Sequence, residues 1–329
     1  MPKLCVMPGD GIGQEVIPAA VTILQAALPN LEIVEAEAGW GCFEKHGASV
    51  PDATLDMIRE CGAGLFGAVS SPSRKVAGYR SAILTMRQEL NLYANIRPVQ
   101  SWPRVSPRPD VNLIVVRENS EGLYVGKEES DGETAVAQRI ITRTASQRIG
   151  QKTAELVQAL GRQKVTIVHK ANVLPLTDGL FRDTVRQEIA QGAPEAEINE
   201  LLVDVAALKM VGSPEIFDVI VTTNLFGDIL SDAAAHWGGG MGLAASLNWG
   251  DGLAIAEPVH GSAPDIAGQG IANPLAAVLS TALLARFVWG LGDVADRLET
   301  AVQQTLAADN YPQLTATRAI QDAVLVNLR

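Results

Sequence analysis

The chain has 329 residues, of which 47% are hydrophobic and 19% are charged. This composition is typical of a folded protein large enough for two domains, and it argues against disorder. The formal net charge of −11 argues against a nucleic-acid partner, and an anionic substrate would need a local cluster of basic side chains. No apolar run reaches the roughly 18 residues that a membrane span needs, and no signal segment follows Met1. We therefore expect a cytoplasmic protein without a membrane partner.

The chain has three cysteines, Cys5, Cys42 and Cys61. Their odd number argues against a complete set of disulfides, and they lack the paired spacing of a cysteine metal site. We interpret all three as reduced structural thiols.

The first part of the chain alternates short apolar runs with helical patterns, which is typical of a mostly parallel α/β sheet. We expect strands at residues 3–7, 31–36 and 63–69, and helices at residues 14–27 and 52–60. A glycine-rich turn at residues 8–13 precedes the first helix. It matches the dinucleotide-binding fingerprint only weakly, because the third glycine spacing is missing.

A polar loop at residues 70–81 leads into an expected helix at residues 82–90, which carries Arg87. Arg97 follows that helix, and Arg117 ends an expected strand at residues 112–116. Arginines at the ends of consecutive elements could converge on one anion, because the guanidinium fork binds a carboxylate through two hydrogen bonds. Taken one at a time, each is more often a surface charge.

The middle of the chain predicts a hairpin outside the main sheet at residues 126–141, where polar and apolar residues alternate. Such an arm commonly pairs with its counterpart in a second subunit. After it we expect helices at residues 146–160, 179–190 and 205–211, and strands at residues 164–169 and 197–204.

The stretch from Phe217 to Asp232 gives the strongest indication of a site. It predicts a buried strand at residues 217–223, a turn at residues 224–227 and then a helix. Asp228 and Asp232 would share one face of that helix, beyond the carboxyl end of a central strand, and a cation would relieve their repulsion. Two solvated acids near a helix start are the alternative.

A second candidate site lies in the loop that begins at His260. Its small residues would let a ligand approach the backbone, and Asp265 could accept hydrogen bonds from two ribose hydroxyls. A plain surface loop is the alternative. A long helix should follow at residues 273–289.

Six motifs in this order resemble the isocitrate and 3-isopropylmalate dehydrogenase family over nearly the whole chain. They lie at residues 9–13, 92–98, 116–124, 169–172, 222–232 and 257–265. The resemblance implies an α/β fold of non-Rossmann type, with a mixed sheet covered by helices on both faces. It also implies a large cofactor-binding domain at residues 1–96 and 254–329, and a small domain at residues 97–253 with the dimer interface and a dimer-clasping β arm at about residues 126–141.

The resemblance further implies a β-decarboxylating dehydrogenase that forms homodimers with shared active sites, and possibly tetramers. Mg²⁺ or Mn²⁺ would be bound by Asp228, Asp232 and the partner subunit's Asp204. The partner subunit's Lys170 would help to remove the hydroxyl proton, and Tyr124 would protonate the enol after CO₂ leaves. The implied substrate-binding residues are Ser81, Arg87, Arg97, Arg117, Tyr124, Lys170 and Asn172. The implied cofactor-binding residues are Asn172, His260, Gly261, Ser262, Ala263, Asp265 and Asn273.

The cofactor and the substrate follow from departures within the family. NADP-dependent relatives have lysine and tyrosine where this chain has Asp265 and Ile266, so we expect NAD. Arg80 and Ser81 match isocitrate dehydrogenases and favour a tricarboxylate, whereas Leu84 is typical of isopropylmalate enzymes. Residues 71–79 resemble the homoisocitrate-oxidising branch best, which serves lysine biosynthesis by the aminoadipate route.

A non-catalytic regulatory chain is the distant alternative from another functional class. Regulatory chains of the family usually lose some of the catalytic groups. This chain keeps Tyr124, Lys170 and all three aspartates, which favours an enzyme.

Overall fold

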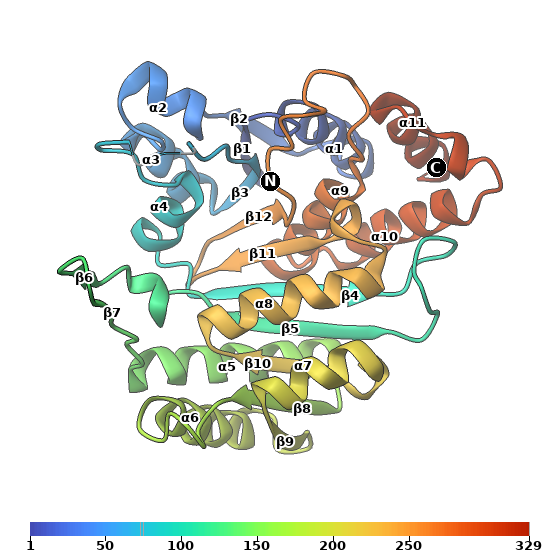
Figure 1. The fold of residues 1–329 in the computed structure, drawn as a ribbon. Coiled ribbons are helices and arrows are strands. Elements are labelled where there is room, and N and C mark those ends of the chain that lie inside the picture. The colour runs from blue at the N-terminus through green and yellow to red at the C-terminus, as the bar shows by residue number, and fades with distance from the viewer. Residues whose placement is uncertain (73, 75, 329) are drawn as a thin grey trace. The chain divides into compact units, whose positions relative to one another are not determined.

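The computed structural model describes residues 1–72, 74 and 76–328. The chain forms two compact units (Figure 1). Unit 1 consists of Met1–Leu92, Trp102–Pro109 and Gly238–Arg329, and unit 2 of Tyr93–Ser101 and Asp110–Trp237. The domain boundaries expected from the sequence stay a prediction. The resemblance of residues 71–79 includes Ser73 and Lys75, which lie outside the described residues.

Unit 1 contains five strands in the order β2-β1-β3-β12-β11. Only the β11–β12 pair is antiparallel among these neighbours. The strands are β1 (Lys3–Gly9), β2 (Glu32–Glu35), β3 (Ala63–Ala68), β11 (Ala245–Trp249) and β12 (Ala254–Pro258). The helices are α1 (Gly13–Ala27), α2 (Trp40–His46), α3 (Asp52–Cys61), α4 (Ala82–Glu89), α9 (Leu275–Leu283), α10 (Gly292–Ala307) and α11 (Thr317–Asn327). A π-helical turn, η5 (Leu284–Val288), extends α9.

The core of unit 1 forms where apolar strands meet apolar helix faces. β3 is buried along its whole length, and α9 is buried on all sides, so both elements lie inside the unit. Helices α1, α9, α10 and α11 pack together, while α3 and α4 contribute Ile58 and Met86 to a separate cluster with Phe66 of β3.

Unit 2 contains five strands in the order β4-β5-β10-β8-β9, of which β4 and β5 are antiparallel and the other neighbours parallel. They are β4 (Ala94–Gln100), β5 (Asn112–Glu118), β8 (Lys164–His169), β9 (Glu197–Leu202) and β10 (Val219–Thr222). The helices are α5 (Arg143–Leu160), α6 (Thr177–Gly192), α7 (Val203–Gly212) and α8 (Asn224–Ala235). α5 packs on α6, and α7 packs on α8, so that each pair covers one face of these strands (Figure 1).

The expected hairpin is present as β6 (Glu128–Ser130) and β7 (Ala135–Ala137), an antiparallel pair in a sheet of its own. Its role as a dimer clasp stays a prediction. Among the described residues, no helix combines the length and the apolar character needed to cross a bilayer.

The mixed α/β fold expected from the sequence is confirmed, and several element boundaries are corrected. The expected turn at residues 224–227 is wrong: α8 begins at Asn224, and the Gly227 amide already donates to the Thr223 carbonyl (2.8 Å). Arg117 lies inside β5 rather than at its end, because β5 continues to pair with β4 through Glu118. Asp204 lies in the first turn of α7 and not at the end of a strand. The elements α2, β4, β11, β12, α10 and α11 were not expected.

Candidate active site

Asp228 and Asp232 lie on α8 and form ion pairs with two arginines of unit 2. Arg117 pairs with Asp228 through its Nη1 atom. Arg97 donates to Asp232 (Nη1 to Oδ1, 2.8 Å), and its Nη2 atom lies 3.7 Å from Oδ1 of Asp228. Both guanidinium groups are buried, whereas the Asp232 side chain is about half exposed. The expected arrangement of two carboxylates on one helical face is confirmed.

The strand register explains why the two arginines meet. β4 and β5 are antiparallel neighbours that place Asn95 opposite Arg117, and Arg97 follows two residues later on the same face. Arg97 Nε donates to Asn95 Oδ1 (2.8 Å). Arg117 lies over Gly227 of α8, where an added Cβ would come within 2.6 Å of the arginine Cγ atom. Only glycine therefore allows α8 to pack this closely on Arg117.

Asn224, at the start of α8, orients Arg117 from the other side. Its Oδ1 atom accepts hydrogen bonds from Nε and Nη2 of Arg117 (3.0 and 2.7 Å), and its own amide donates to the Glu121 carbonyl (3.1 Å). We did not identify Asn224 as a site residue from the sequence. The signal was its position four residues before Asp228, on the same helical face.

Tyr124 completes this cluster from the short 3₁₀ helix η1 (Leu123–Val125). Its hydroxyl donates to Oδ2 of Asp228 (2.6 Å), and the Arg117 guanidinium lies 5.0 Å from its ring centre. Burial and the bond to Asp228 raise the pKa of Tyr124, so the phenol keeps its proton at neutral pH. Burial alone would raise the pKa of Asp228, but Arg117, Tyr124 and Arg97 together hold it below its usual value.

Lys170 and Asp204 form a separate ion pair. Lys170 follows β8, and its hydrogen bond to Asp204 lowers the pKa of that exposed carboxyl. Within the described part of one chain, the carboxylate oxygens of Asp204, Asp228 and Asp232 do not lie close enough together to hold one metal ion. Asn172 is exposed two residues beyond Lys170.

Asp178 is a buried acid that we did not identify from the sequence. Its Oδ2 atom accepts a hydrogen bond from the Lys170 backbone amide (2.6 Å) and so fixes the turn that carries Lys170. The signal was its position at the start of α6, eight residues after Lys170.

Arg87 lies in unit 1, where it is buried and forms hydrogen bonds to two side chains. It donates to Asn248 (Nε to Oδ1, 2.9 Å) and to Glu257 (Nη2 to Oε1, 2.9 Å), and Asn248 also donates to Glu257 (2.8 Å). Ser81 immediately precedes its helix, α4. The expected convergence of Arg87 with Arg97 and Arg117 stays a prediction.

The loop after β12 in unit 1 carries the residues expected to bind the cofactor. The Ile12 amide donates to the Ser262 carbonyl (2.9 Å), and a Cβ added at Gly11 would lie 2.1 Å from that oxygen. The glycine-rich turn thus serves to hold this loop. Ala263 has a positive φ of 40°, and Asp265 is exposed at the loop surface.

Two details of unit 1 fit a bound nucleotide. The Nε2 atom of His260 is buried and makes no hydrogen bond within the described residues. Burial also lowers the pKa of His260, so its ring is neutral at pH 7 and can face an uncharged base. Asn273 is held by the Leu275 amide, which donates to its Oδ1 atom (3.0 Å).

The acidic pair in unit 2 fits a divalent metal by its donor chemistry. Mg²⁺ and Mn²⁺ prefer carboxylate oxygens, and the lowered pKa of Asp228 keeps it ionised as such a ligand requires. Asp228 and Asp232 could offer such oxygen atoms from one face of α8, and both are partly accessible to solvent.

Comparison with known proteins places these residues in context. Residues 3–322 match the family model described as isocitrate/isopropylmalate dehydrogenase. The chain is 50% identical to isocitrate/homoisocitrate dehydrogenase of Thermus thermophilus, with 99% of this chain and 98% of the relative covered. It is 48% identical to 3-isopropylmalate dehydrogenase of Methanothermobacter thermautotrophicus over 93% and 91% of the two chains. The crystal structure of isocitrate dehydrogenase from Methylococcus capsulatus matches with a TM-score of 0.93, 41% identity and full coverage of both chains.

Proposed function

Because the chain belongs to the isocitrate/isopropylmalate dehydrogenase family, we propose that it catalyses the NAD-dependent oxidative decarboxylation of homoisocitrate to 2-oxoadipate and CO₂. This reaction would serve lysine biosynthesis by the aminoadipate route. The cluster of Arg97, Arg117, Tyr124, Asp228 and Asp232 is the observation that carries the proposal. The relatives carry several substrate names, so isocitrate and 3-isopropylmalate are the alternatives within the family.

The arginine–aspartate cluster suits the joint binding of an anion and a cation. Arg97 and Arg117 now neutralise Asp228 and Asp232. A polycarboxylate can take over the two guanidinium groups, while a divalent cation takes over the two carboxylates, so that every buried charge stays paired. Binding of either ligand alone would leave charges of one sign without partners. We therefore expect the substrate and the metal to strengthen each other's binding.

Each of the expected site residues has a defined task in the proposed reaction. Ser81, Arg87, Arg97, Arg117 and Asn172 bind the substrate. Lys170 accepts the hydroxyl proton when hydride leaves for NAD. Tyr124 holds a proton at neutral pH and can deliver it to the enol after CO₂ leaves. Mg²⁺ or Mn²⁺, held by Asp228, Asp232 and the partner subunit's Asp204, would stabilise the electrons released by the breaking carbon–carbon bond.

We further propose that the loop after β12 binds NAD rather than NADP. The exposed Asp265 can accept hydrogen bonds from ribose hydroxyls and would repel a 2′-phosphate. His260, Gly261, Ser262, Ala263 and Asn273 would contact the rest of the nucleotide.

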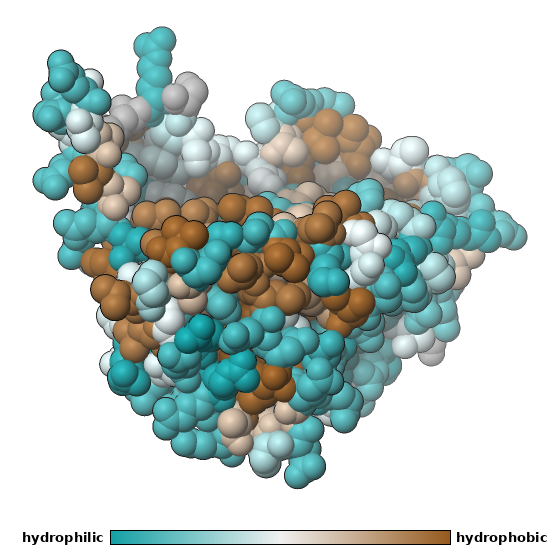
Figure 2. Space-filling model, turned by 60° about the horizontal axis from the view of Figure 1, so that its bottom comes forward, coloured by the Kyte–Doolittle hydropathy of each residue, from teal (hydrophilic) through white to brown (hydrophobic). Residues whose placement is uncertain are grey.

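A homodimer with shared active sites is part of the same proposal. Large apolar side chains are exposed on α7 and α8, where Leu208, Val211 and Ile229 are 73%, 68% and 57% exposed. Figure 2 shows apolar residues gathered in a broad brown band. Such a surface marks an interface, and here a second copy of the chain would also bring Lys170 and Asp204 to the aspartates of α8.

A parallel assay of three substrates tests the proposed function. The purified chain is given homoisocitrate, isocitrate or 3-isopropylmalate with NAD, and NADH is measured with Mg²⁺ and with a chelator. We expect metal-dependent turnover that is fastest with homoisocitrate. Preference for 3-isopropylmalate would keep the reaction type and show that Leu84 determines substrate choice. No turnover with any of the three would instead support a regulatory chain.

A further inference from the structure

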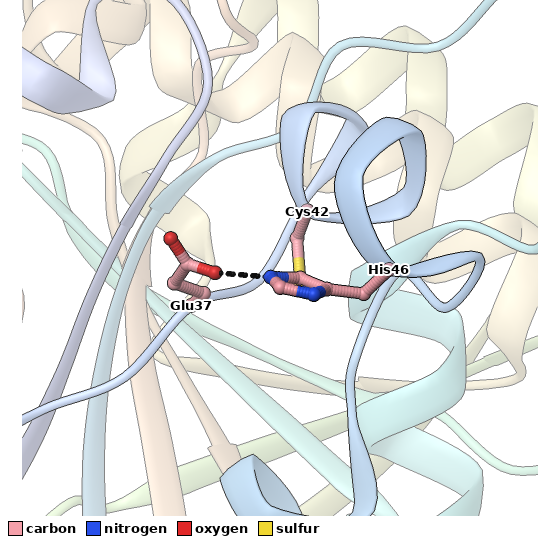
Figure 3. A group of neighbouring side chains, drawn as sticks. All are labelled: Glu37, Cys42 and His46. Carbon is pink, nitrogen blue, oxygen red and sulfur yellow. Dashed lines mark hydrogen bonds and ion pairs between the residues drawn. The ribbon is translucent and has the colours of Figure 1, made fainter.

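A second group of side chains that could bind a metal lies in unit 1 and contains none of the residues assigned above. Glu37 lies in the loop between β2 and α2, and Cys42 and His46 lie one turn apart on α2 (Figure 3). Each residue offers one ligand atom, and the three atoms all lie within 4.8 Å of one another. Glu37 Oε2 is 2.7 Å from His46 Nε2. The sequence signal for this cluster is the four-residue spacing of Cys42 and His46, which the spacing of the cysteines alone does not show.

The backbone around this cluster is held at several points. The carboxylate of Asp10 accepts hydrogen bonds from the amides of Trp40 and Gly41 (2.7 and 2.9 Å), which anchors the start of α2. Gly39 has a φ of +119°, and a Cβ there would lie 2.6 Å from the same carboxylate. The Thr54 hydroxyl donates to the Glu37 carbonyl (2.9 Å). The ligands thus start from a fixed scaffold, which lowers the cost of ordering them around an ion.

Ion pairs alone would explain two of the three side chains. Glu37 pairs with His46 and with Lys45 (3.0 Å), an arrangement that is common on protein surfaces. Cys42 is different. Its buried sulfur atom lies beside the ligand atoms of Glu37 and His46 but takes no part in their ion pairs. Sulfur, imidazole nitrogen and carboxylate oxygen together form a donor set of the kind that Zn²⁺ takes.

We propose that Glu37, Cys42 and His46 bind a Zn²⁺ ion. Bonds of about 2.0–2.3 Å in a tetrahedron separate ligand atoms by roughly 3.5 Å, so Glu37 and His46 need to move apart by less than about 1 Å. Both side chains are about half exposed and free to do so. The Cys42 thiol releases its proton to solvent as the sulfur–zinc bond forms, and the neutral imidazole of His46 gives up its hydrogen bond to Glu37.

A pocket of about 830 Å³ lies beside the three side chains, and the fourth zinc ligand would bind from this pocket. The residues that line it include Glu37, Cys42, Lys45, Asp10 and Ile17. The site therefore has the composition of an open zinc site, with three protein ligands and one exchangeable position. Lys45, which lies 3.0 Å from Glu37, would weaken zinc binding modestly by charge repulsion.

Cobalt spectroscopy tests the site on the full-length, reduced protein. Excess Mg²⁺ is included to occupy sites made only of carboxylates. We expect one equivalent of Co²⁺ to give the near-ultraviolet charge-transfer band of a cobalt–thiolate bond, and Zn²⁺ to abolish that band by displacement. Cys42→Ser should remove the band. His46→Gln and Glu37→Gln should each weaken Co²⁺ and Zn²⁺ binding by roughly tenfold or more, whereas Lys45→Gln should bind at least as tightly as the wild type.

Cys61→Ser is the matched control, because Cys61 is only partly buried and is not one of the three proposed ligands, and this variant should keep the band. Absence of the band in the wild type would overturn the proposal. So would a band that persists in Cys42→Ser, or binding that is unchanged in His46→Gln and Glu37→Gln. The last two variants alter exposed side chains, so they decide the question even if Cys42→Ser fails to fold.

Discussion

Asp178, which is completely buried, forms an ion pair with Arg139, whose side chain is 15% exposed. Arg139 also donates to the Thr223 hydroxyl (3.1 Å), and its guanidinium lies 5.3 Å from the ring centre of Phe226. Asp178 in turn accepts the hydrogen bond from the Lys170 amide. The Asp178–Arg139 pair therefore connects three segments: the residues that follow β7, the turn that carries Lys170, and the start of α8.

Asp178→Asn should lower the free energy of unfolding by about 3 kcal/mol, because it leaves a nearly buried arginine without its counter-charge. Chemical denaturation with the enzyme free of ligands would measure this loss. The double variant Asp178→Asn with Arg139→Met should recover part of it, since it removes the unpaired charge. A loss below about 0.5 kcal/mol in the single variant would contradict a structural role for the pair.

Asp228→Asn should lower metal-dependent turnover by at least roughly 100-fold, because it removes one proposed metal ligand and the counter-charge of Arg117. NADH formation at a series of Mg²⁺ concentrations would measure the effect, and size-exclusion chromatography would check that the assembly is unchanged. Asp322→Asn on α11 is the control, since its exposed ion pair with Arg318 contributes little. Near-normal turnover in Asp228→Asn would refute the assigned role.

Tyr124→Phe should lower kcat by about 10²–10⁴-fold and change KM much less, because it removes a proton donor and keeps the ring. The raised pKa of Tyr124 means that the phenol stays protonated through the neutral range, so titration of this group should not change wild-type turnover there. Steady-state kinetics over a pH series would test both points. An unchanged kcat would remove Tyr124 from the reaction.

Asp265→Lys should reduce the ratio of kcat/KM for NAD to that for NADP by at least about tenfold, because the charge at the proposed ribose site changes sign. Asp265 is exposed, so the variant should fold normally. Asp322→Lys, which makes the same change of charge on α11, should leave the ratio unaltered. A wild-type enzyme that already prefers NADP would disprove the proposed cofactor.

Glu121→Gln should change how stability depends on pH. Burial raises the pKa of Glu121 to about 7, from 4.5 in a solvent-exposed chain. The folded state therefore binds more protons than the unfolded state between these values, and the wild type loses stability as the pH rises from about 4.5 to about 7. Denaturation at a series of pH values should show the variant gaining stability relative to the wild type across this window. A difference that is independent of pH would show that the carboxyl of Glu121 titrates normally when folded.

Regular apolar patterns made much of the fold predictable. The strand expected at residues 164–169 is β8 without any change of boundary, and the β-branched run at residues 219–222 is completely buried in β10. The short helix α2 was missed because its seven residues carry no apolar period and follow a loop. β4 was missed because Asn95 and Arg97 interrupt its apolar residues, and their side chains are buried only through pairing with each other and with α8.

The candidate site was predictable where a residue type points to a chemistry, as with Asp228 and Asp232. The roles of Asn224 and Asp178 were not, because each acts by orienting a second side chain or amide that is distant in sequence. Asn224 and Arg117, for example, are 107 residues apart. Such contacts depend on strand register and helix packing, which a single sequence does not specify.

The order of the strands affects the order in which the chain can fold. β3, made early, pairs with β12, and the turn at Ile12 bonds to the carbonyl of Ser262. Unit 1 thus combines the first 92 residues with residues beyond Gly238, whereas most of unit 2 is a continuous stretch between them. On a ribosome that adds about 5–20 residues per second, the first strands would wait on the order of ten seconds or more for their partners. During that delay unit 2 can already fold, and the open edge of β3 is the part of the nascent chain that most needs protection from aggregation.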